Sequence, residues 1–306
     1  MLELVKMRDG QYLHVDVFGS GEKVVVLLHG IGGNSTMWTP YCLPHLKDYK
    51  FIIPNLRGFG KSGGMTFTTP RNVLSDYALD LAELIDYYSP DDKVILASLS
   101  MGAYASMQYF KFVGAERVEK YLNIDQGPKA MNSKEWKFGI GGDDNEELFG
   151  GFKELMNQCS NEVGKPFYGL DSTLQADFID NVHRFFALAF HQNFEQKILH
   201  HLMTNENMVV RYVAKRVSQA NNWQSYYHCL RSYVECDYDF RKIMSEIDIP
   251  ITVFIGKFST MYPKGGQQHI ADNAKNAVVK EFNAGHALMY TSPIKFAVAF
   301  SQFLNS

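Results

Sequence analysis

The sequence predicts an α/β protein in which a mostly parallel β-sheet, flanked by helices, is interrupted by an inserted helical segment. Three observations support this expectation. Buried apolar strands alternate with helical patterns over the first third of the chain, as in a parallel sheet covered on both faces. Only helical patterns follow from residue 127 to 237, and strand patterns then return. We therefore expect a core built from residues 1–126 and 238–306, with residues 127–237 forming the insertion.

Short apolar runs predict the strands of the core. Residues 2–7 and 12–19 are expected to form a hairpin around Asp9-Gly10, which is a turn signal. The other strands are near-continuous apolar runs, as in parallel strands buried on both faces. They are KVVVLLHG (23–30), YKFIIPN (49–55), KVILASLS (93–100), VEKYLNID (118–125), IPITVFIG (249–256) and AVVKEF (277–282).

Apolar residues at helical spacing predict the helices. In the core, one helix is expected to begin at Thr69 and Pro70, which suit a cap and a first turn, and another directly follows the strand 93–100. A last helix begins around Thr291 and Ser292 with Pro293 at its first position. The helical patterns of the insertion cover residues 146–158, 174–190, 207–219 and 223–234.

Composition argues against several classes of protein. The formal net charge of −3 over 306 residues gives no reason to expect a nucleic acid or an anionic membrane as partner. No apolar stretch approaches the ~18 residues of a membrane span, and the first residues lack a signal peptide's apolar core. The four cysteines show no metal-ligand spacing. We expect a cytoplasmic protein with reduced thiols, no metal and no organic cofactor; its oligomeric state stays open.

Ser98-Leu99-Ser100-Met101-Gly102 lies between a buried strand and a helix. A strand that turns sharply into a helix can present one nucleophilic side chain, provided that the positions two before and two after are small. Ser98 and Gly102 satisfy this rule around Ser100, whereas Leu96 violates it around Ser98. The alternative is an ordinary strand-to-helix turn with a capping serine. Ser100 is the candidate nucleophile.

His29-Gly30-Ile31-Gly32-Gly33 follows the strand VVVLL. A glycine-rich turn there allows the backbone N–H of Ile31, together with that of Met101, to form an oxyanion hole. A dinucleotide-binding loop would want a third glycine at position 35 and a carboxylate near position 55, and both are absent. NLRGFGKS (55–62) lacks the first glycine of a phosphate-binding loop, so nucleotide binding is discounted.

Gly285-His286 follows the strand AVVKEF directly. A histidine in a short loop at the C-terminal end of a strand is well placed to act as a general base, and the alternative is a capping or core histidine.

Five motifs, in this order along the chain, resemble those of the α/β-hydrolase family: HGIGG, NLRGFGKS, SLSMG, IPITVFIG and FNAGHALMY. The chain is most similar to bacterial serine esterase and haloperoxidase-like members with a helical cap. The resemblance implies the α/β-hydrolase fold, with a nucleophile after the fifth strand, an acid after the sixth or seventh and a histidine after the eighth. The insertion falls where the family carries its cap, so residues 127–237 are expected to form a helical lid over Ser100.

Two positions depart from the family pattern. Asn55 stands where the family usually has Asp, at a position that braces a loop. No carboxylate follows VFIG, since Ser259 stands where many members have Asp. The family permits an acid after the sixth strand instead, and the ends of neighbouring strands lie only ~5 Å apart. We therefore predict that Asp125 is the acid; the alternative is that Asp125 caps the chain as it enters the insertion.

The resemblance implies a serine carboxylesterase that acts on a small or medium apolar ester through Ser100, His286 and Asp125. Perhydrolase, lactonase or C–C hydrolase activity on the same residues, or a non-catalytic binding protein or sensor, remain alternatives. Some aromatic residues of the insertion are expected to line an apolar acyl pocket, while most pack it onto the core. They are Trp136, Phe138, Phe149, Phe152, Phe185, Phe186, Trp223 and Tyr226.

Overall fold

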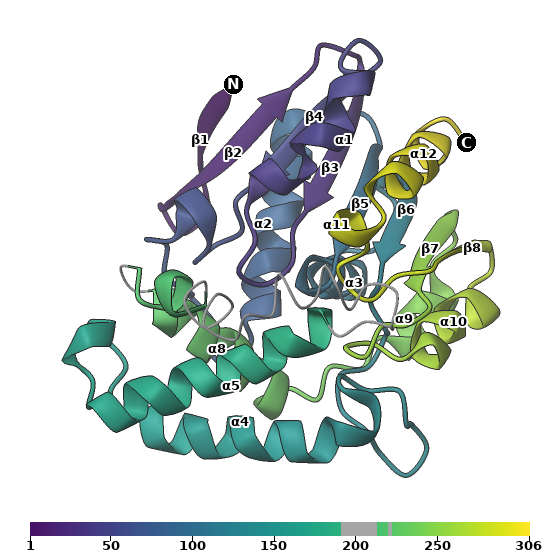
Figure 1. Cartoon of the computed structure of the whole chain (residues 1–306). Coiled ribbons are helices and arrows are strands. Elements are labelled where there is room, and N and C mark those ends of the chain that lie inside the picture. The colour runs from purple at the N-terminus through teal and green to yellow at the C-terminus, as the bar shows by residue number, and fades with distance from the viewer. Residues whose placement is uncertain (191–212, 220–221) are drawn as a thin grey trace.

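The computed structural model describes residues 1–190, 213–219 and 222–306. Its centre is an eight-stranded sheet with the order β1-β2-β4-β3-β5-β6-β7-β8 (Figure 1). β1 pairs with β2 and β2 with β4 in antiparallel fashion, and every other pairing is parallel. The predicted α/β class, with a mostly parallel sheet, is confirmed. The strands are β1 (Leu2–Lys6), β2 (Tyr12–Phe18), β3 (Lys23–Leu28), β4 (Tyr49–Pro54), β5 (Val94–Leu99), β6 (Val118–Ile124), β7 (Ile251–Gly256) and β8 (Ala277–Phe282).

Helices cover both faces of this sheet. The helices are α1 (Thr39–Cys42), α2 (Val73–Tyr88), α3 (Met101–Phe112), α4 (Asn145–Cys159), α5 (Ser172–Phe190), α8 (Asn222–Glu235), α9 (Arg241–Glu246), α10 (Lys264–Asn273), α11 (Leu288–Thr291) and α12 (Pro293–Leu304). Along β3, alternate side chains enter two different apolar clusters. One cluster contains α2 and α3, and the other contains α1 and α12. Among the described residues, no helix is long and apolar enough to cross a lipid bilayer.

The start of α2 differs from the sequence expectation. The helix begins at Val73, with Asn72 as its N-cap, and not at Thr69 and Pro70. The backbone N–H groups of Thr68 and Thr69 instead donate to the carboxylate of Asp76, at 2.8 and 2.9 Å. These bonds hold the residues before α2 as a loop. Pro70, although typical of a first helical turn, therefore lies in this loop and not in a helix.

The predicted helical patterns of the insertion correspond to α4, α5 and α8. The remaining predicted pattern, 207–219, lies partly outside the described residues, and its residues 213–217 are helical. The described part of 127–237 contributes no strand to the sheet. In Figure 1, α5 and α8 lie beyond the C-terminal ends of β3 and β6, and α4 packs farther out. Side chains of α4, α5 and α8 belong to the same apolar cluster as α2 and α3.

Candidate active site

Ser100 lies at a sharp turn between β5 and α3. Its backbone has φ 54° and ψ −125°, in the region that costs energy for residues other than glycine. The turn brings its neighbours into close contact. A Cβ at Gly102 would lie 2.7 Å from the carbonyl oxygen of His29, and a Cβ at Gly30 only 3.0 Å from Cβ of Ser100. The structure therefore presents Ser100 against the loop that follows β3.

Ser98 takes part in a different set of contacts. Its hydroxyl lies 2.8 Å from Oγ of Ser106 and donates to the Tyr121 hydroxyl at 3.2 Å, and its side chain is fully buried. Both partners sit in the layer between β5, α3 and β6, behind the turn. Ser98 thus serves as the small residue that the turn requires.

The loop after β3 is held in place by His29. Its Nε2 accepts a hydrogen bond from the N–H of Leu56 at 2.9 Å, so the proton of the neutral ring is on Nδ1, which donates to the carbonyl of Gly30 at 2.7 Å. Ile31 follows in this loop, and Met101 is the first residue of α3, where N–H groups lack an acceptor within the helix. Gly30, the neighbour of Ile31, lies against Ser100, and Met101 directly follows it, so the N–H groups of Ile31 and Met101 stay the predicted oxyanion donors.

Burial of His29 makes stability depend on pH. Desolvation lowers the pKa of His29 to about 4, from 6.5. The unfolded chain then binds this proton at a higher pH than the folded chain, so the stabilisation is complete above pH 6.5 and is lost as pH falls toward 4. We expect a loss of about 3 kcal/mol from this group. Urea unfolding between pH 7.5 and 4 should show a steeper decline for the wild type than for His29→Asn. Equal slopes would contradict this prediction.

Asp125 and His286 are in direct contact. Nδ1 of His286 lies 2.7 Å from Oδ2 of Asp125, and the carboxylate is fully buried. Asp125 follows β6 and has φ 45°, one of three positive φ values at non-glycine residues in the described part of the chain. Like Ser100, it sits in strained backbone at the C-terminal end of a central strand. Such strain persists only where the surroundings enforce it, and it gathers at functional sites.

Three further donors satisfy the carboxylate of Asp125. The N–H of Gly256 and Nε2 of Gln267 donate to Oδ1 at 2.8 and 2.9 Å, and Oγ of Ser259 donates to Oδ2 at 2.6 Å. These bonds satisfy the oxygens of a carboxylate that is buried from water. Ser259, at the position where the family resemblance led us to look for an acid, therefore contacts the carboxylate of Asp125 from the loop after the neighbouring strand β7. Gln267 has no sequence signal that would have indicated this role.

Three other carboxylates, near the end of the insertion and before β7, make contacts away from His286. Asp237 and Asp239 pair with Nζ of Lys129 at 3.0 and 3.3 Å, and Asp248 lies 3.7 Å from Nζ of Lys275. None of them contacts His286 in the described structure. The described residues also contain no cluster of three His, Cys, Asp or Glu side chains that could hold a metal ion.

Asn55 braces the loop that precedes α1. Its Nδ2 donates to Oγ of Ser35 at 3.1 Å, and its Oδ1 accepts from the N–H of Lys61 at 3.3 Å. The Ser35 hydroxyl in turn donates to the carboxylate of Asp16. An amide at position 55 therefore fills the bracing role expected there, with both of its polar atoms in use.

The insertion reaches the loops that carry the site. The N–H of Ala287 donates to the carbonyl of Ala189 at 3.3 Å, and Oγ1 of Thr260 donates to the carbonyl of Leu188 at 2.8 Å. Both acceptors lie near the end of α5. A Cβ at Gly32 would lie 2.5 Å from the Tyr226 hydroxyl oxygen and 3.1 Å from Cζ of Phe186. Two insertion aromatics therefore lie directly over the loop after β3.

The other aromatic residues of the insertion pack away from this loop or against one another. Phe152 contacts Phe149 and Phe185, and Trp223 contacts Phe178 and donates its indole N–H to the carbonyl of Lys165. Trp136 lies under the guanidinium of Arg241, and Phe138 is 40% exposed. The expectation that most of these residues pack the insertion fits this arrangement.

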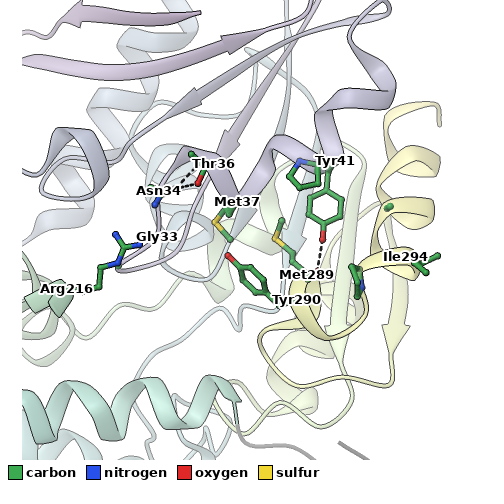
Figure 2. Close-up of a pocket in the computed structure, with 13 residues that line it drawn as sticks. Gly33, Asn34, Thr36, Met37, Tyr41, Arg216, Met289, Tyr290 and Ile294 are labelled. Carbon is green, nitrogen blue, oxygen red and sulfur yellow. Dashed lines mark hydrogen bonds between the residues drawn. The ribbon is translucent and has the colours of Figure 1, made fainter. Parts of the chain in front are cut away.

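A pocket of about 650 Å³ borders the site on the side of α11 and α12 (Figure 2). Gly32 and Gly33 form one wall, Met289 and Tyr290 another, and Arg216 of the insertion lies near Gly33. The hydroxyl of Tyr41 is held by the carbonyl of Met289 at 2.6 Å. The pocket therefore opens between the loop after β3 and the segment that directly follows His286.

Three polar side chains near Ser100 were not predicted from the sequence. The hydroxyl groups of Tyr104 and Tyr262 and Oε1 of Gln126 are buried, and the described residues offer them no hydrogen bond of normal length and angle. Only weak contacts join each phenol to Gln126 and the Tyr262 hydroxyl to Ser100. The Tyr262 ring packs on His286 with 5.4 Å between the ring centroids. Burial raises the pKa of Tyr262, and the side chains of Gln126 and Ser100 oppose that rise, so all three lie close together. Single tyrosines and glutamines carry no motif, which explains why they were missed.

Comparison with known proteins places the chain in a family. The family described as "alpha/beta hydrolase fold" matches residues 23–293. A pimeloyl-[acyl-carrier protein] methyl ester esterase from Legionella pneumophila (strain Corby) is 30% identical over 169 residues, which are 54% of this chain and 62% of that protein. The Karrikin insensitive 2 receptor CA of Petunia hybrida is 26% identical over 141 residues, 44% of this chain and 50% of the receptor. The chain thus matches less than two thirds of the length of either relative.

Two solved structures share the whole fold. The esterase EaEST from Exiguobacterium antarcticum has a TM-score of 0.75 at 19% identity, and a bromoperoxidase from Bacillus anthracis has a TM-score of 0.74 at 20% identity. In both cases the match covers 100% of each chain. The resemblance to esterase and haloperoxidase-like members is therefore confirmed, and the chain belongs to the α/β-hydrolase fold family.

Proposed function

We propose that this protein is a serine hydrolase that cleaves carboxylic esters through Ser100, His286 and Asp125. One observation carries the proposal most directly: the 2.7 Å contact between Nδ1 of His286 and a buried, fully hydrogen-bonded Asp125. This contact requires a proton on Nδ1 and leaves Nε2 of His286 as the basic atom. A histidine held in this tautomer at the C-terminal edge of the sheet, beside a strained serine turn, is suited to general-base catalysis.

The proposed reaction has two halves. Nε2 of His286 removes the proton of the Ser100 hydroxyl as Oγ attacks the ester carbonyl, and the carbonyl electrons move to the oxygen. The N–H groups of Ile31 and Met101 stabilise that oxyanion, and one such donor can be worth roughly 10²–10³ in rate. The C–O bond breaks, and the alcohol leaves with the proton from His286. Water, activated by the same base, then releases the acid and restores Ser100.

Asp125 stabilises the imidazolium that forms in each half. Four hydrogen bonds converge on its carboxylate, which fixes the ring orientation as well as the tautomer. No step requires a metal or an organic cofactor.

The proposed substrate is a small-molecule ester with a small or medium apolar part. Phe186 and Tyr226 of the insertion lie over the loop that would hold the oxyanion, and apolar and aromatic side chains typically line such sites. We propose that residues 127–237 act as the cap of the core formed by 1–126 and 238–306. The esterase relative supports ester hydrolysis, although its match covers only part of each chain.

A fluorophosphonate probe combined with an ester assay tests this proposal. We expect the probe to label the folded protein once, on the peptide that contains Ser100, and to abolish hydrolysis of short-chain p-nitrophenyl esters in proportion to labelling. Absence of labelling in folded protein would contradict the serine mechanism.

A second candidate function is that of a binding protein or sensor, which the match to the Karrikin insensitive 2 receptor favours. Such a protein would also be labelled but would turn over esters slowly or only once. Hydrolysis of many ester molecules by each protein molecule would favour the esterase over the second candidate.

A further inference from the structure

The groups of Tyr104, Gln126 and Tyr262 that lack a well-formed hydrogen bond form a polar cluster beside the proposed nucleophile. All three side chains are at most 1% exposed. A buried polar group without a well-formed hydrogen bond destabilises the folded protein, so three such groups at one place need a reason. In a site built to bind a ligand, the ligand supplies the missing partners.

The cluster is assembled from three separate elements around Ser100. Tyr104 lies one helical turn after Ser100 in α3, Gln126 directly follows Asp125, and Tyr262 lies in the loop after β7. The rings of Tyr104 and Tyr262 are 6.2 Å apart and meet edge to face. The Gln126 side chain acts on the pKa of both phenols, which places it between them.

The topology of the sheet separates this cluster from the expected oxyanion hole. Ser100 follows β5, whose neighbours are β3 on one side and β6 on the other. The loop with Ile31 belongs to the β3 side, whereas Gln126 and Tyr262 follow β6 and β7. The phenols therefore face a different part of a bound ester from the one that the oxyanion donors hold.

The charges around the cluster restrict what it can bind. Burial raises the pKa of both phenols, so each is a neutral O–H group, and the carboxylate of Asp125 raises that of Tyr262 further. A second anion there would be repelled, whereas a neutral oxygen can accept from a phenol O–H or donate to Oε1 of Gln126.

We propose that Tyr104, Gln126 and Tyr262 form a polar subsite that binds a neutral hydroxyl, carbonyl or ether oxygen of the substrate within a few bonds of the scissile ester. This inference rests on the proposed ester hydrolysis and makes it more specific. The preferred substrates are then esters that carry a further oxygen atom outside the ester group. The apolar surface from Phe186 and Tyr226 covers the side of the substrate opposite that oxygen.

Matched ester pairs test the subsite. One pair differs in the acyl part, ethyl 3-hydroxybutanoate against ethyl butanoate, and the other in the alcohol part, 2-methoxyethyl acetate against butyl acetate. The measured quantity is the ratio of kcat/KM within each pair. Since a neutral hydrogen bond contributes about 0.5–1.5 kcal/mol, Tyr262→Phe should lower at least one ratio roughly three- to tenfold. Tyr104→Phe, on a different element, should lower the same ratio.

The matched control is Tyr238→Phe. Tyr238 packs on Tyr104 at 6.2 Å, but its hydroxyl already bonds Ser232 and donates to Oδ1 of Asn72 at 2.9 Å. Its substitution should leave both ratios unchanged. The subsite would be overturned if both Tyr262→Phe and Tyr104→Phe left the two kcat/KM ratios unchanged. This includes the case in which a variant lowers kcat/KM equally for all four esters. Failure of the proposed function would look different, because the wild type would then hydrolyse none of the four esters.

Discussion

Ser100→Ala will abolish ester hydrolysis and fluorophosphonate labelling, whereas Ser98→Ala will retain most of both. Removing a nucleophilic serine lowers kcat by roughly 10⁶ in a well-studied serine hydrolase, because the residual rate comes only from binding and oxyanion stabilisation. Ser98 is the nearest matched control, two residues away and equally small. Its hydroxyl is hydrogen-bonded to Ser106 and Tyr121. Removing it should lower the free energy of unfolding by about 1 kcal/mol and leave kcat nearly unchanged.

The measurement is steady-state hydrolysis of a p-nitrophenyl ester together with intact-mass detection of the labelled protein. Circular dichroism and a thermal scan establish that both variants fold. An inactive Ser98→Ala variant beside an active Ser100→Ala variant would reverse the assignment of the nucleophile.

Asp125→Asn should lower kcat by roughly 10⁴ while leaving the fold intact, by analogy with the effect of the same change in a serine protease triad. The amide is nearly isosteric with the carboxylate, but it cannot stabilise the imidazolium. Its NH₂ group would also favour the wrong tautomer of His286. In the wild type, Nδ1 of His286 lies 2.7 Å from the charged Oδ2 of Asp125, and the substitution removes this negative charge.

Asp239→Asn provides the matched control for this experiment. Asp239 is a partly buried carboxylate paired with Lys129 and Arg241, and it lies in the stretch between the insertion and β7. Its substitution should change kcat less than about twofold, since no contact links it to His286. If Asp125→Asn turned over esters at nearly the wild-type rate, Asp125 would be a structural residue and Ser259 the remaining candidate beside His286.

Strong local patterns made most of the fold predictable. The runs that form β3, β5 and β7 are apolar on both faces, which is typical of buried parallel strands. Ser100 stays the predicted nucleophile, because Leu96 excludes the neighbouring serine from the same turn. Asp125 stays the predicted acid, because few acids occupy the C-terminal ends of the central strands.

Features that depend on individual side-chain contacts, near or distant in sequence, could not be predicted. Thr69 and Pro70 have the local chemistry of a helix start, yet the carboxylate of Asp76 captures the preceding N–H groups and moves the start to Val73. Likewise, Gln267 reaches Asp125 from 142 residues away in sequence. Neither interaction leaves a periodic or spaced signal, so only the folded chain shows it.

The hydrogen bond from Ser259 to Asp125 suggests how an acid can change strands during evolution. The Ser259 oxygen lies 2.6 Å from the oxygen that contacts His286, so an aspartate at 259 would reach the same imidazole. A lineage that acquired the second acid would briefly carry two adjacent carboxylates, which can share a proton and keep one negative charge. Either position could then mutate while the histidine kept its partner. The two contacts thus identify two positions, on neighbouring strands, from which a carboxylate could bond the same nitrogen of His286.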